Sequence, residues 1–359
     1  MPTLAELVDG VIGVDTHRDS LVAAAVTPIG ALLAQAEVTA NARGYHKLLD
    51  FARQEVSGPR CWALEGTGSY GAGLSSFLVE QGEQVFEVCR PKRPPHRGRK
   101  TDFLDALRAA REVLTSEQLI CPRRRGDREA LRVLLATRHT AVLARTAGIN
   151  HLKALIVCAP ETLRAELRDK GSKGQVAYCA HLRDRPAQSL EHRMTVRALR
   201  STALRIQSLR AEANELEEEI GLLVAQIAPE LLALSGVGPI SAAQVMVSWS
   251  HAGRFRSEAA FASFAGAAPI PASSGQTNRH RLDRSGDRRL NNALHTIVLV
   301  RMRIDLATQT YLARRTAEGK TKRDIHRCLK RAVARQLFRL LDRTALPEAS
   351  TICSQAVAA

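Results

Sequence analysis

Short apolar segments that alternate with helical segments over the first 115 residues constrain the fold more than any other feature. Five of them occur, at residues 11–15, 21–26, 31–38, 60–65 and 84–89. They are too short for typical helices and are bounded by turn residues or acids, so they predict β-strands. Between and after them, helices are expected over 41–53, over 70–81 and from Thr101 onward. Three consecutive strands followed by alternating helices and strands predict a mixed sheet with helices on both faces.

The rest of the chain has helical patterns. Residues 127–160 predict a helix that ends at Pro160, and 161–188 read as a linker or short helices. A long helix is expected over 189–228, because apolar residues recur there in steps of three and four. This heptad seam favours a coiled coil, between chains or as a hairpin, over a helix packed on its own domain. Its residues are Ile206, Leu209, Ala213, Leu216, Ile220, Leu223 and Ile227.

Charge is distributed unevenly along the chain. The 359 residues include 52 Lys+Arg and 36 Asp+Glu, a formal net charge of +16. The first 89 residues hold 5 basic and 11 acidic side chains, whereas the remaining 270 hold 47 and 25. An acidic region followed by a strongly basic one indicates that one part carries out chemistry while the other binds a nucleic acid. Aromatic residues, at 4%, are too few for a surface that works mainly by base stacking.

Three groups of residues are candidates for nucleic-acid contact. Residues 90–100 form a basic loop, because three prolines and a glycine prevent a helix there. A turn with two glycines precedes a predicted helix near residue 239, and its backbone N–H groups could hold a phosphate or serve the turn alone. Five arginines follow Gly275 and could neutralise a phosphate, at positions 279, 281, 284, 288 and 289. The candidates are Arg90, Lys92, Arg93, Arg97, Arg99 and Lys100 in the loop, Gly236 and Gly238 in the turn, and Arg279 and Arg281.

Membrane and secreted classes do not fit the sequence. No apolar run approaches the roughly 18 residues of a membrane span, and the first ten residues, MPTLAELVDG, are acidic, unlike a signal peptide. Seven cysteines without zinc-site spacing favour reduced thiols. We therefore expect a cytoplasmic protein with no membrane contact.

Four acids form the candidate catalytic site. Asp15 and Glu65 each end a predicted strand, and Asp102 and Asp105 lie three residues apart at a helix start, so they share one face. Four carboxylates at one sheet edge would repel each other without cations. The set therefore predicts a site for two Mg²⁺ ions that support phosphoryl transfer. In the alternative reading, Asp102 only caps its helix and Glu65 is a surface acid.

Several motifs together resemble a known family. GVDTHRD, ALEGTGSYG and KTDFLDALRAAR resemble the RuvC-like DEDD domain of insertion sequence 110 family transposases. LSGVGPISAAQ, GAAPIPASSGQTNRHRLDRSGDRRLNNALH and TAEGKTKRDIHRCLKRAVARQLF resemble the second transposase domain of that family. The resemblance extends from Val11 to about Leu341. The chain departs from the commoner family pattern at Gly286-Asp287, where that pattern has Gly-Asn.

The resemblance implies a ribonuclease-H-like (RuvC-like) α/β domain, a long coiled-coil helix and an all-α C-terminal domain with a catalytic serine. It also implies DNA recombination guided by a structured noncoding RNA. Asp15, Glu65, Asp102 and Asp105 would bind the metal ions. The serine nucleophile would be Ser273 or Ser274, and the adjoining Gly275 favours Ser274.

These expectations combine into one prediction. The catalytic domain would span residues 1–160, the linker and coiled coil 161–230, the helical transposase domain 231–342 and a flexible tail 343–359. The chain would be a DNA transposase or recombinase that forms a dimer or tetramer through the 199–227 helix and binds DNA and a guide RNA. One alternative is a RuvC-like Holliday-junction endonuclease that needs only the four acids, and another is a nucleic-acid-binding protein without enzymatic activity.

Overall fold

A computed structural model describes residues 3–88, 101–116, 119–271, 280–281, 283 and 285–344. The chain divides into two compact units that are interleaved in sequence. The sheet unit comprises residues 1–125 together with 249–262 and 338–359, and the helical unit comprises 126–248 together with 263–337. The domain boundaries expected from the sequence stay a prediction.

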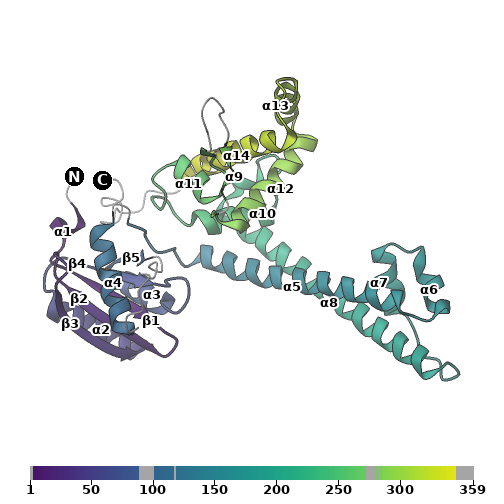
Figure 1. Cartoon of the computed structure of the whole chain (residues 1–359), viewed down its shortest axis with the longest axis horizontal. Coiled ribbons are helices and arrows are strands. Elements are labelled where there is room, and N and C mark those ends of the chain that lie inside the picture. Colours follow the sequence, from purple (N-terminus) through teal and green to yellow (C-terminus); the bar gives the residue numbers. More distant parts are fainter. Residues whose placement is uncertain are drawn as a thin grey trace. The chain divides into compact units, whose positions relative to one another are not determined.

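The sheet unit contains a five-stranded mixed sheet in the order β3-β2-β1-β4-β5 (Figure 1). Neighbours are antiparallel between β1 and β2 and between β2 and β3, whereas β4 runs parallel to both β1 and β5. All five predicted strands are therefore present, and the expected mixed sheet is confirmed. The strands are β1 (Gly10–Thr16), β2 (Ser20–Val26), β3 (Leu32–Thr39), β4 (Arg60–Glu65) and β5 (Gln84–Val88).

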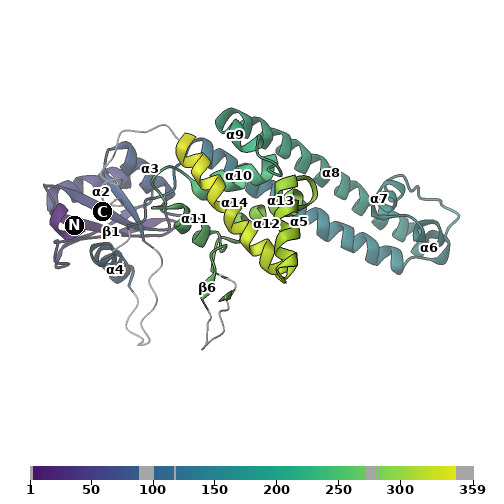
Figure 2. The same ribbon diagram turned by 90° about the horizontal axis from the view of Figure 1, so that it is seen from above.

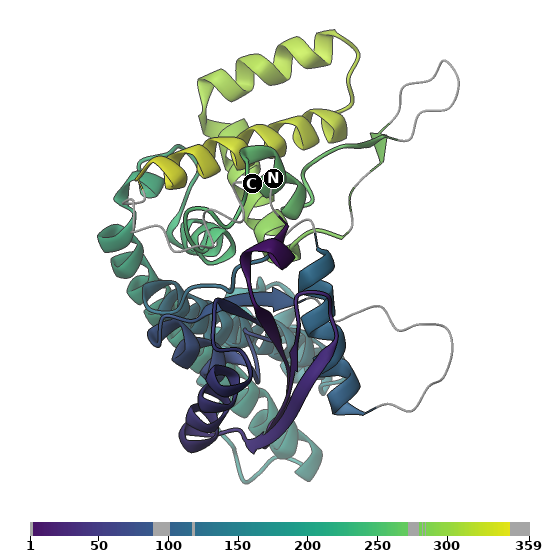
Figure 3. The same cartoon turned by 90° about the vertical axis from the view of Figure 1, so that its left-hand side faces the viewer.

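Helices cover both faces of this sheet (Figure 3). On one face, α1 (Leu4–Leu7) and α4 (Asp102–Thr115) pack on a core that includes Val11 and Phe86. On the other face, α2 (Ala42–Glu55) and α3 (Ala72–Glu80) pack on a core that includes Ile12 and Trp62. Successive residues of a strand point to opposite faces, so Val11 and Ile12 enter different cores.

Capping residues set the starts of two of these helices, as their side-chain chemistry predicts. The side chain of Asn41 accepts a hydrogen bond from Gly44 N at 2.9 Å at the start of α2. Thr101 accepts from Leu104 N at the start of α4. Because Thr101 fixes where α4 begins, it also fixes the position of the acids in the first turn of that helix.

A buried ion pair joins β4 to the turn before β5. The guanidinium of Arg60 donates to both carboxylate oxygens of Glu83, and Trp62 Nε1 donates to Glu83 Oε2 at 2.9 Å. The two charged side chains are only 15% and 7% exposed. The charge of Glu83 is therefore neutralised inside the fold, and the pair fixes the parallel edge of the sheet.

In the helical unit, α5 (Asp127–Val157) packs along α8 (Leu190–Ile227) in antiparallel orientation (Figure 2). Gly148 of α5 lies against Ile206 of α8, and Arg138 forms an ion pair with Glu217. The seam residues Ile206, Ala213 and Ile220 are buried within this one chain. The long helix is confirmed, whereas assembly of several chains through it stays a prediction.

Two short helices, α6 (Glu161–Arg168) and α7 (Ser172–Ala180), connect α5 to α8. The later helices are α9 (Pro229–Leu232), α10 (Pro239–Trp249), α11 (Glu258–Phe264), α12 (Arg288–Ile304), α13 (Leu306–Ala317) and α14 (Lys322–Thr344). The all-α expectation is wrong at one place, because β6 (Ile270–Pro271) and β7 (His280–Arg281) form an antiparallel pair. Prolines near β6 exclude helix but allow an extended edge strand.

Two further sequence expectations can be compared with the structure. Within the described residues, no helix is long and apolar enough to cross a membrane. Of the cysteines in the described part of the chain, Cys61, Cys158, Cys179 and Cys328 are free thiols, but Cys121 is disulfide-bonded. The expectation of reduced thiols is therefore wrong at that position, because spacing in the sequence does not show which sulfurs the fold brings together.

Candidate active site

Asp15 and Glu65 lie at the same edge of two adjacent parallel strands. Val14 pairs with Leu64 between β1 and β4, and each acid is the next residue in its strand. The hydroxyl of Thr16 donates to the backbone oxygen of Glu65 at 2.9 Å, which ties the two strand ends together. The sequence prediction that both acids share one sheet edge agrees with this register.

The first turn of α4 places Asp102 and Asp105 close to Asp15. Glycine at position 13 permits this, because a Cβ there would lie 2.0 Å from Ala106 O, so the helix backbone lies directly on β1. Burial raises the pKa of the Asp15 carboxyl. His17 lowers this pKa, while the nearby carboxylates of Asp102 and Asp105 raise it further. Negative charge is therefore concentrated where β1 meets α4.

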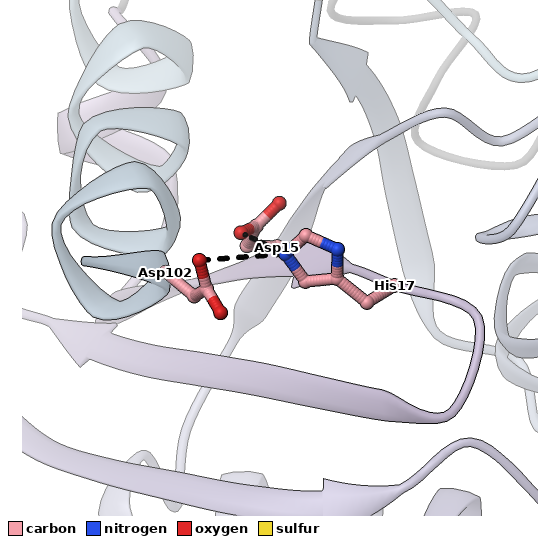
Figure 4. Close-up of side chains that lie close together, drawn as sticks. All are labelled: Asp15, His17 and Asp102. Carbon is pink, nitrogen blue, oxygen red and sulfur yellow. Dashed lines mark hydrogen bonds and ion pairs between the residues drawn. The ribbon is translucent and has the colours of Figure 1, made fainter. Parts of the chain in front are cut away.

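His17 joins this cluster and was not among the predicted site residues. Its Nε2 lies 3.2 Å from Asp15 Oδ2 and 3.4 Å from Asp102 Oδ1 (Figure 4). The three side chains offer ligand atoms that all lie within 4.8 Å of one another. One sequence signal could have identified His17, because residues two apart in extended chain lie on the same side. Its contact with Asp102 could not be anticipated in that way.

The other two predicted acids lie outside this three-residue set. Asp105 accepts a hydrogen bond from Arg108 Nη1 at 2.9 Å. Glu65 lies near Glu112 of α4, whose pKa is raised by burial and by the charge of Glu65. The structure thus brings Asp15, Asp102 and His17 together, with Asp105 close enough to influence Asp15. A metal-binding role for each of the four acids stays a prediction.

The donor set fits a divalent cation. Asp15 is buried, with a side chain only 11% exposed, and its carboxylate and that of Asp102 both contact the same ring nitrogen of His17, Nε2. Burial raises the pKa of Asp15, and repulsion from Asp102 and Asp105 raises it further; a cation between these groups would offset both effects. Carboxylate oxygens suit Mg²⁺ and Mn²⁺, whereas an imidazole nitrogen suits Mn²⁺ better.

Most of the predicted nucleic-acid contacts lie outside the residues that the structure describes. Arg90, Lys92, Arg93, Arg97, Arg99 and Lys100 lie outside the described residues, as do Ser273, Ser274 and Arg279. Arg281 is described, and it is an exposed residue of β7. Their roles stay predictions.

The two-glycine turn packs against α12. Gly236 has a φ of +76°, and a Cβ there would lie 3.0 Å from both Ile297 O and Arg301 Cγ. Arg301 Nε also donates to Ser235 O at 2.7 Å. Packing therefore explains the glycine at 236, whereas nothing lies within 4 Å of an added Cβ at Gly238. Phosphate binding by this turn stays a prediction.

Asp287, where the sequence departs from the family pattern, caps α12. Its Oδ1 accepts hydrogen bonds from Arg289 N and Leu290 N, both at 2.9 Å. Its Oδ2 accepts from the hydroxyl of Ser248 at 3.2 Å. Aspartate and asparagine are equally good N-caps, so the change from Gly-Asn to Gly-Asp keeps the start of this helix.

Two family models match the chain. Residues 12–158 match the model DEDD_Tnp_IS110, which is described as a transposase. Residues 228–313 match a second model, described as the transposase IS116/IS110/IS902 family. The first region contains all four predicted acids as well as His17.

Two curated proteins are also similar to the chain. The insertion element IS900 uncharacterized 42 kDa protein of Mycobacterium paratuberculosis is 28% identical, over 72% of this chain and 77% of that protein. The insertion element IS110 uncharacterized 43.6 kDa protein of Streptomyces coelicolor is 32% identical, over 34% of this chain and 31% of its own length.

Proposed function

We propose that this chain, which belongs to the IS110 family of transposases, cuts and rejoins DNA strands with a divalent-metal site and a serine nucleophile. The observation that carries the proposal is the meeting of Asp15 and Asp102 beside His17, in the region matched by the DEDD model. The fold gathers these groups from two elements that are distant in sequence, although their mutual repulsion is unfavourable. Such an arrangement is typical of an active site.

The metal site would use the acids at the end of β1 and β4 and in the first turn of α4. Asp15, Asp102 and His17 would hold one cation, and Glu65 and Asp105 would complete a site for two Mg²⁺ ions. Bound ions would activate the attacking oxygen and stabilise the leaving oxygen during phosphoryl transfer. The residues themselves orient the ions, and the burial of Asp15 limits the access of water to that carboxylate.

The serine step would take place in the helical transposase region. The Ser274 oxygen would form a bond to the phosphorus of the DNA strand, and the bond from phosphorus to the leaving sugar oxygen would break. The serine proton passes to a base, and the sugar oxygen takes up a proton. Arg279 and Arg281 follow in the sequence and supply positive charge for the phosphate. The resemblance of PASSG to the family's serine motif supports this role.

The proposed partners follow from charge and family. The 270 residues after position 89 hold 47 basic and 25 acidic side chains, which suits a chain that binds DNA and a structured guide RNA. Assembly into a dimer or tetramer through α8 would bring metal and serine sites from different copies onto one DNA junction. We expect such a protein to act at the prokaryotic nucleoid.

The first test measures strand cleavage by the full-length protein on DNA that carries the element ends, with guide RNA present. Asp102→Asn removes one carboxylate charge with little change in shape, so cleavage should be lost while the melting temperature stays similar. Asp19→Asn is the matched control, because that side chain is 88% exposed in the neighbouring turn. Cleavage by Asp102→Asn at the wild-type rate would contradict the proposal.

The second test separates the proposed serine chemistry from its alternatives. Ser274→Ala should abolish both recombination and a covalent protein–DNA adduct on a denaturing gel, whereas Ser273→Ala should keep both. Metal-dependent cleavage that survives in Ser274→Ala would favour a RuvC-like structure-specific endonuclease. Binding without any metal-dependent cleavage by the wild-type protein would favour a non-enzymatic nucleic-acid-binding protein.

A further inference from the structure

A polar pocket of about 360 Å³ lies in the helical unit, next to the N-terminal half of α12 and to α14. This volume is in the range of ligand-binding pockets, about 300–1,000 Å³. Its lining includes Asp283, Arg288, Asn291, Asn292, His295 and Lys330. None of these residues belongs to the acid cluster of the sheet unit. Of them, the sequence singled out only Arg288, as one of the arginines that follow the serine motif.

Two contacting glycines fix the shape of the pocket. Gly266 has a φ of +62°, and a Cβ on Gly286 would lie 2.3 Å from Gly266 N. Asp287 N donates to Phe264 O at 2.7 Å, and Asn291 Nδ2 donates to Ala265 O at 2.7 Å. The loop after α11 is thereby held against the start of α12, so the pocket is built into the fold.

Lys330 is a buried cation that has no anionic partner among the described residues. It is 7% exposed, and its Nζ donates to the neutral amide oxygen Asn291 Oδ1 at 2.8 Å. No carboxylate of the described residues forms an ion pair with it. Burial lowers its pKa, and the charge of Arg327 lowers it further. An ammonium has three donors, so two remain after the bond to Asn291. A bound anion would satisfy them and offset the cost of burying this charge.

Arg288 adds a second positive charge. It is the first residue of α12, it lines the pocket, and its exposed guanidinium has no partner among the described residues. Arg288, Asn291 or Asn292, and His295 follow one another at helical spacing, so they lie along one side of α12. The backbone at the start of α12 is already capped by Asp287. An anion in this pocket would therefore be held mainly by side chains.

The acid in the lining does not cancel these charges. Asp283 is the one carboxylate among the described lining residues, and its Oδ1 accepts from Ser285 N at 2.8 Å and from Ser285 Oγ at 2.6 Å. Those hydrogen bonds lower its pKa and keep it directed toward Ser285. Arg288 and Lys330 together exceed its single charge, so the lining has net positive charge.

His295 contributes a further polar group. Its Nδ1 lies 2.7 Å from Nε2 of His326, and the two rings are 4.5 Å apart. Because Nδ1 is used in this contact, Nε2 is the ring nitrogen left for a ligand. The imidazole is the only aromatic ring among the described lining residues. A nucleobase would therefore have little to stack on, which favours recognition of the backbone over recognition of a base.

We propose that this pocket binds one backbone phosphate of a DNA strand, with Lys330 and Arg288 as the charged contacts and Asn292 and His295 as additional donors. A phosphate is a compact anion with several acceptor oxygens, and it matches a set of donors that converge from two helices. The choice of DNA rests on the proposed function. A phosphate of the guide RNA is the competing source, and the test separates the two.

The test measures the affinity of the full-length protein for a labelled DNA duplex that carries an element end, at several salt concentrations, with a chelator present to prevent cleavage. Lys330→Met and Arg288→Gln should each weaken binding at least about tenfold and reduce the salt slope by about one unit. The double variant should lose no more slope than either single variant, because both residues contact one phosphate. Arg303→Gln, an exposed arginine at the other end of α12, is the matched control and should change neither quantity.

A neutral methylphosphonate linkage, moved along each strand in turn, locates the contact. At one position of the neutral linkage, the wild-type protein should lose affinity for the DNA, whereas the affinity of Lys330→Met should not change. Arg288→Gln changes an exposed side chain, so it tests the pocket even if Lys330→Met fails to fold. Wild-type affinity in both variants, or a loss confined to binding of the guide RNA, would overturn the proposal. A protein that binds in this pattern but never cuts DNA would contradict the proposed function alone.

Discussion

The sheet unit and the helical unit each gather charge that the fold leaves incompletely neutralised, but the sign differs. In the sheet unit, Asp15 and Asp102 concentrate negative charge where β1 meets α4. In the helical unit, Lys330 and Arg288 concentrate positive charge beside α12. The first arrangement calls for a cation and the second for an anion. In the proposed function, these opposite signs would serve complementary tasks on DNA, because one site would bind the cations and the other a phosphate.

The Arg60–Glu83 pair provides the contrast within the sheet unit. Its charges are also buried, but each has its opposite in contact. A buried pair of this kind stabilises the fold and leaves no demand for a ligand. Burial of a charged group is therefore a weak sign of function by itself, and burial without a counter-charge is the stronger sign.

The largest expected effect is on DNA cleavage, and it comes from a change in the acid cluster of the sheet unit. Asp15→Asn should reduce the rate of DNA cleavage at least about 10⁴-fold, a loss of about 5 kcal/mol in transition-state stabilisation. DNA affinity in chelator should stay within a factor of two, because the variant leaves the basic pocket unchanged. Quenched-flow cleavage and equilibrium binding measure the two quantities. An equal loss in both would mean that the two regions do not have separate tasks.

The next effect concerns the buried ion pair between Arg60 and Glu83. Glu83→Ala leaves the guanidinium of Arg60 buried without its carboxylate, and it should lower the free energy of unfolding of the sheet unit by about 3–5 kcal/mol. Urea unfolding followed by circular dichroism measures this change. Glu80→Ala, at an exposed position at the end of α3, is the control and should change stability by less than about 0.5 kcal/mol. A similar small loss for Glu83→Ala would show that the pair is dispensable.

Metal binding should stabilise only the acidic region. At a concentration one hundred times its Kd, Mg²⁺ or Mn²⁺ should raise the free energy of unfolding of the sheet unit by about 2.7 kcal/mol. Asp102→Asn should remove most of this gain, and His17→Ala should weaken Mn²⁺ more than Mg²⁺. Calorimetric melting with each metal tests both statements. As a control, the metal should stabilise Lys330→Met as much as it stabilises the wild-type protein.

A smaller effect lies in the helical unit. Asp287→Ala removes the cap of α12 and should cost about 1 kcal/mol of stability, without any change in stabilisation by metal. Asp287→Asn keeps an acceptor oxygen at the same position and should restore nearly all of the loss. Melting temperatures of the three proteins in chelator test this. If Asp287→Asn is as unstable as Asp287→Ala, the stabilising role of Asp287 depends on its negative charge, which acts on Ser248 or on the start of α12.

The smallest effect is a dependence on pH in the absence of metal. The pKa of Asp15 is raised in the folded state by burial, with Asp102 and Asp105 adding to the shift. The folded protein therefore holds this proton more tightly than the unfolded chain. That contribution to stability is complete below the unfolded value of about 3.9 and is lost as pH rises through the folded value.

Asp15→Asn has no such proton to lose. In chelator, it should therefore be slightly more stable than the wild-type protein at pH 7, and the difference should shrink as the pH falls toward 4. Urea unfolding of both proteins across this range measures it. A difference that grows on acidification would show that Asp15 is stabilised as the anion.

Local patterns predicted most of the elements. The long helix expected over 189–228 is α8, Leu190–Ile227, because a serine cap, a heptad seam and Pro229 mark it within a short stretch of sequence. Asn41 and Thr101 likewise mark helix starts through hydrogen bonds that span three residues. Such features depend on neighbours in the chain, so sequence alone shows them.

Long-range contacts could not be predicted in this way. His17 becomes part of the candidate site through Asp102, which lies 85 residues later in the chain. Lys330 is ordinary in sequence, and it becomes notable only because the fold buries it beside Asn291. The partner of the α8 seam within the chain is α5, a choice that the heptad pattern leaves open. Each of these outcomes depends on which elements fold against one another.

The spacing of the acid cluster depends on Gly13, a residue that is not itself part of the cluster. A Cβ at this residue would lie 2.0 Å from Ala106 O and 2.7 Å from Ala110 N, so main chain rests on main chain where α4 crosses β1. The distance between Asp15 and Asp102 is therefore set by backbone packing, and side-chain rotation could not compensate if the helix were displaced. Alanine at 13 would have to lift the helix, and a displacement of about 1 Å can cost about a hundredfold in rate. The absence of a side chain at Gly13 thus sets the separation of Asp15 and Asp102.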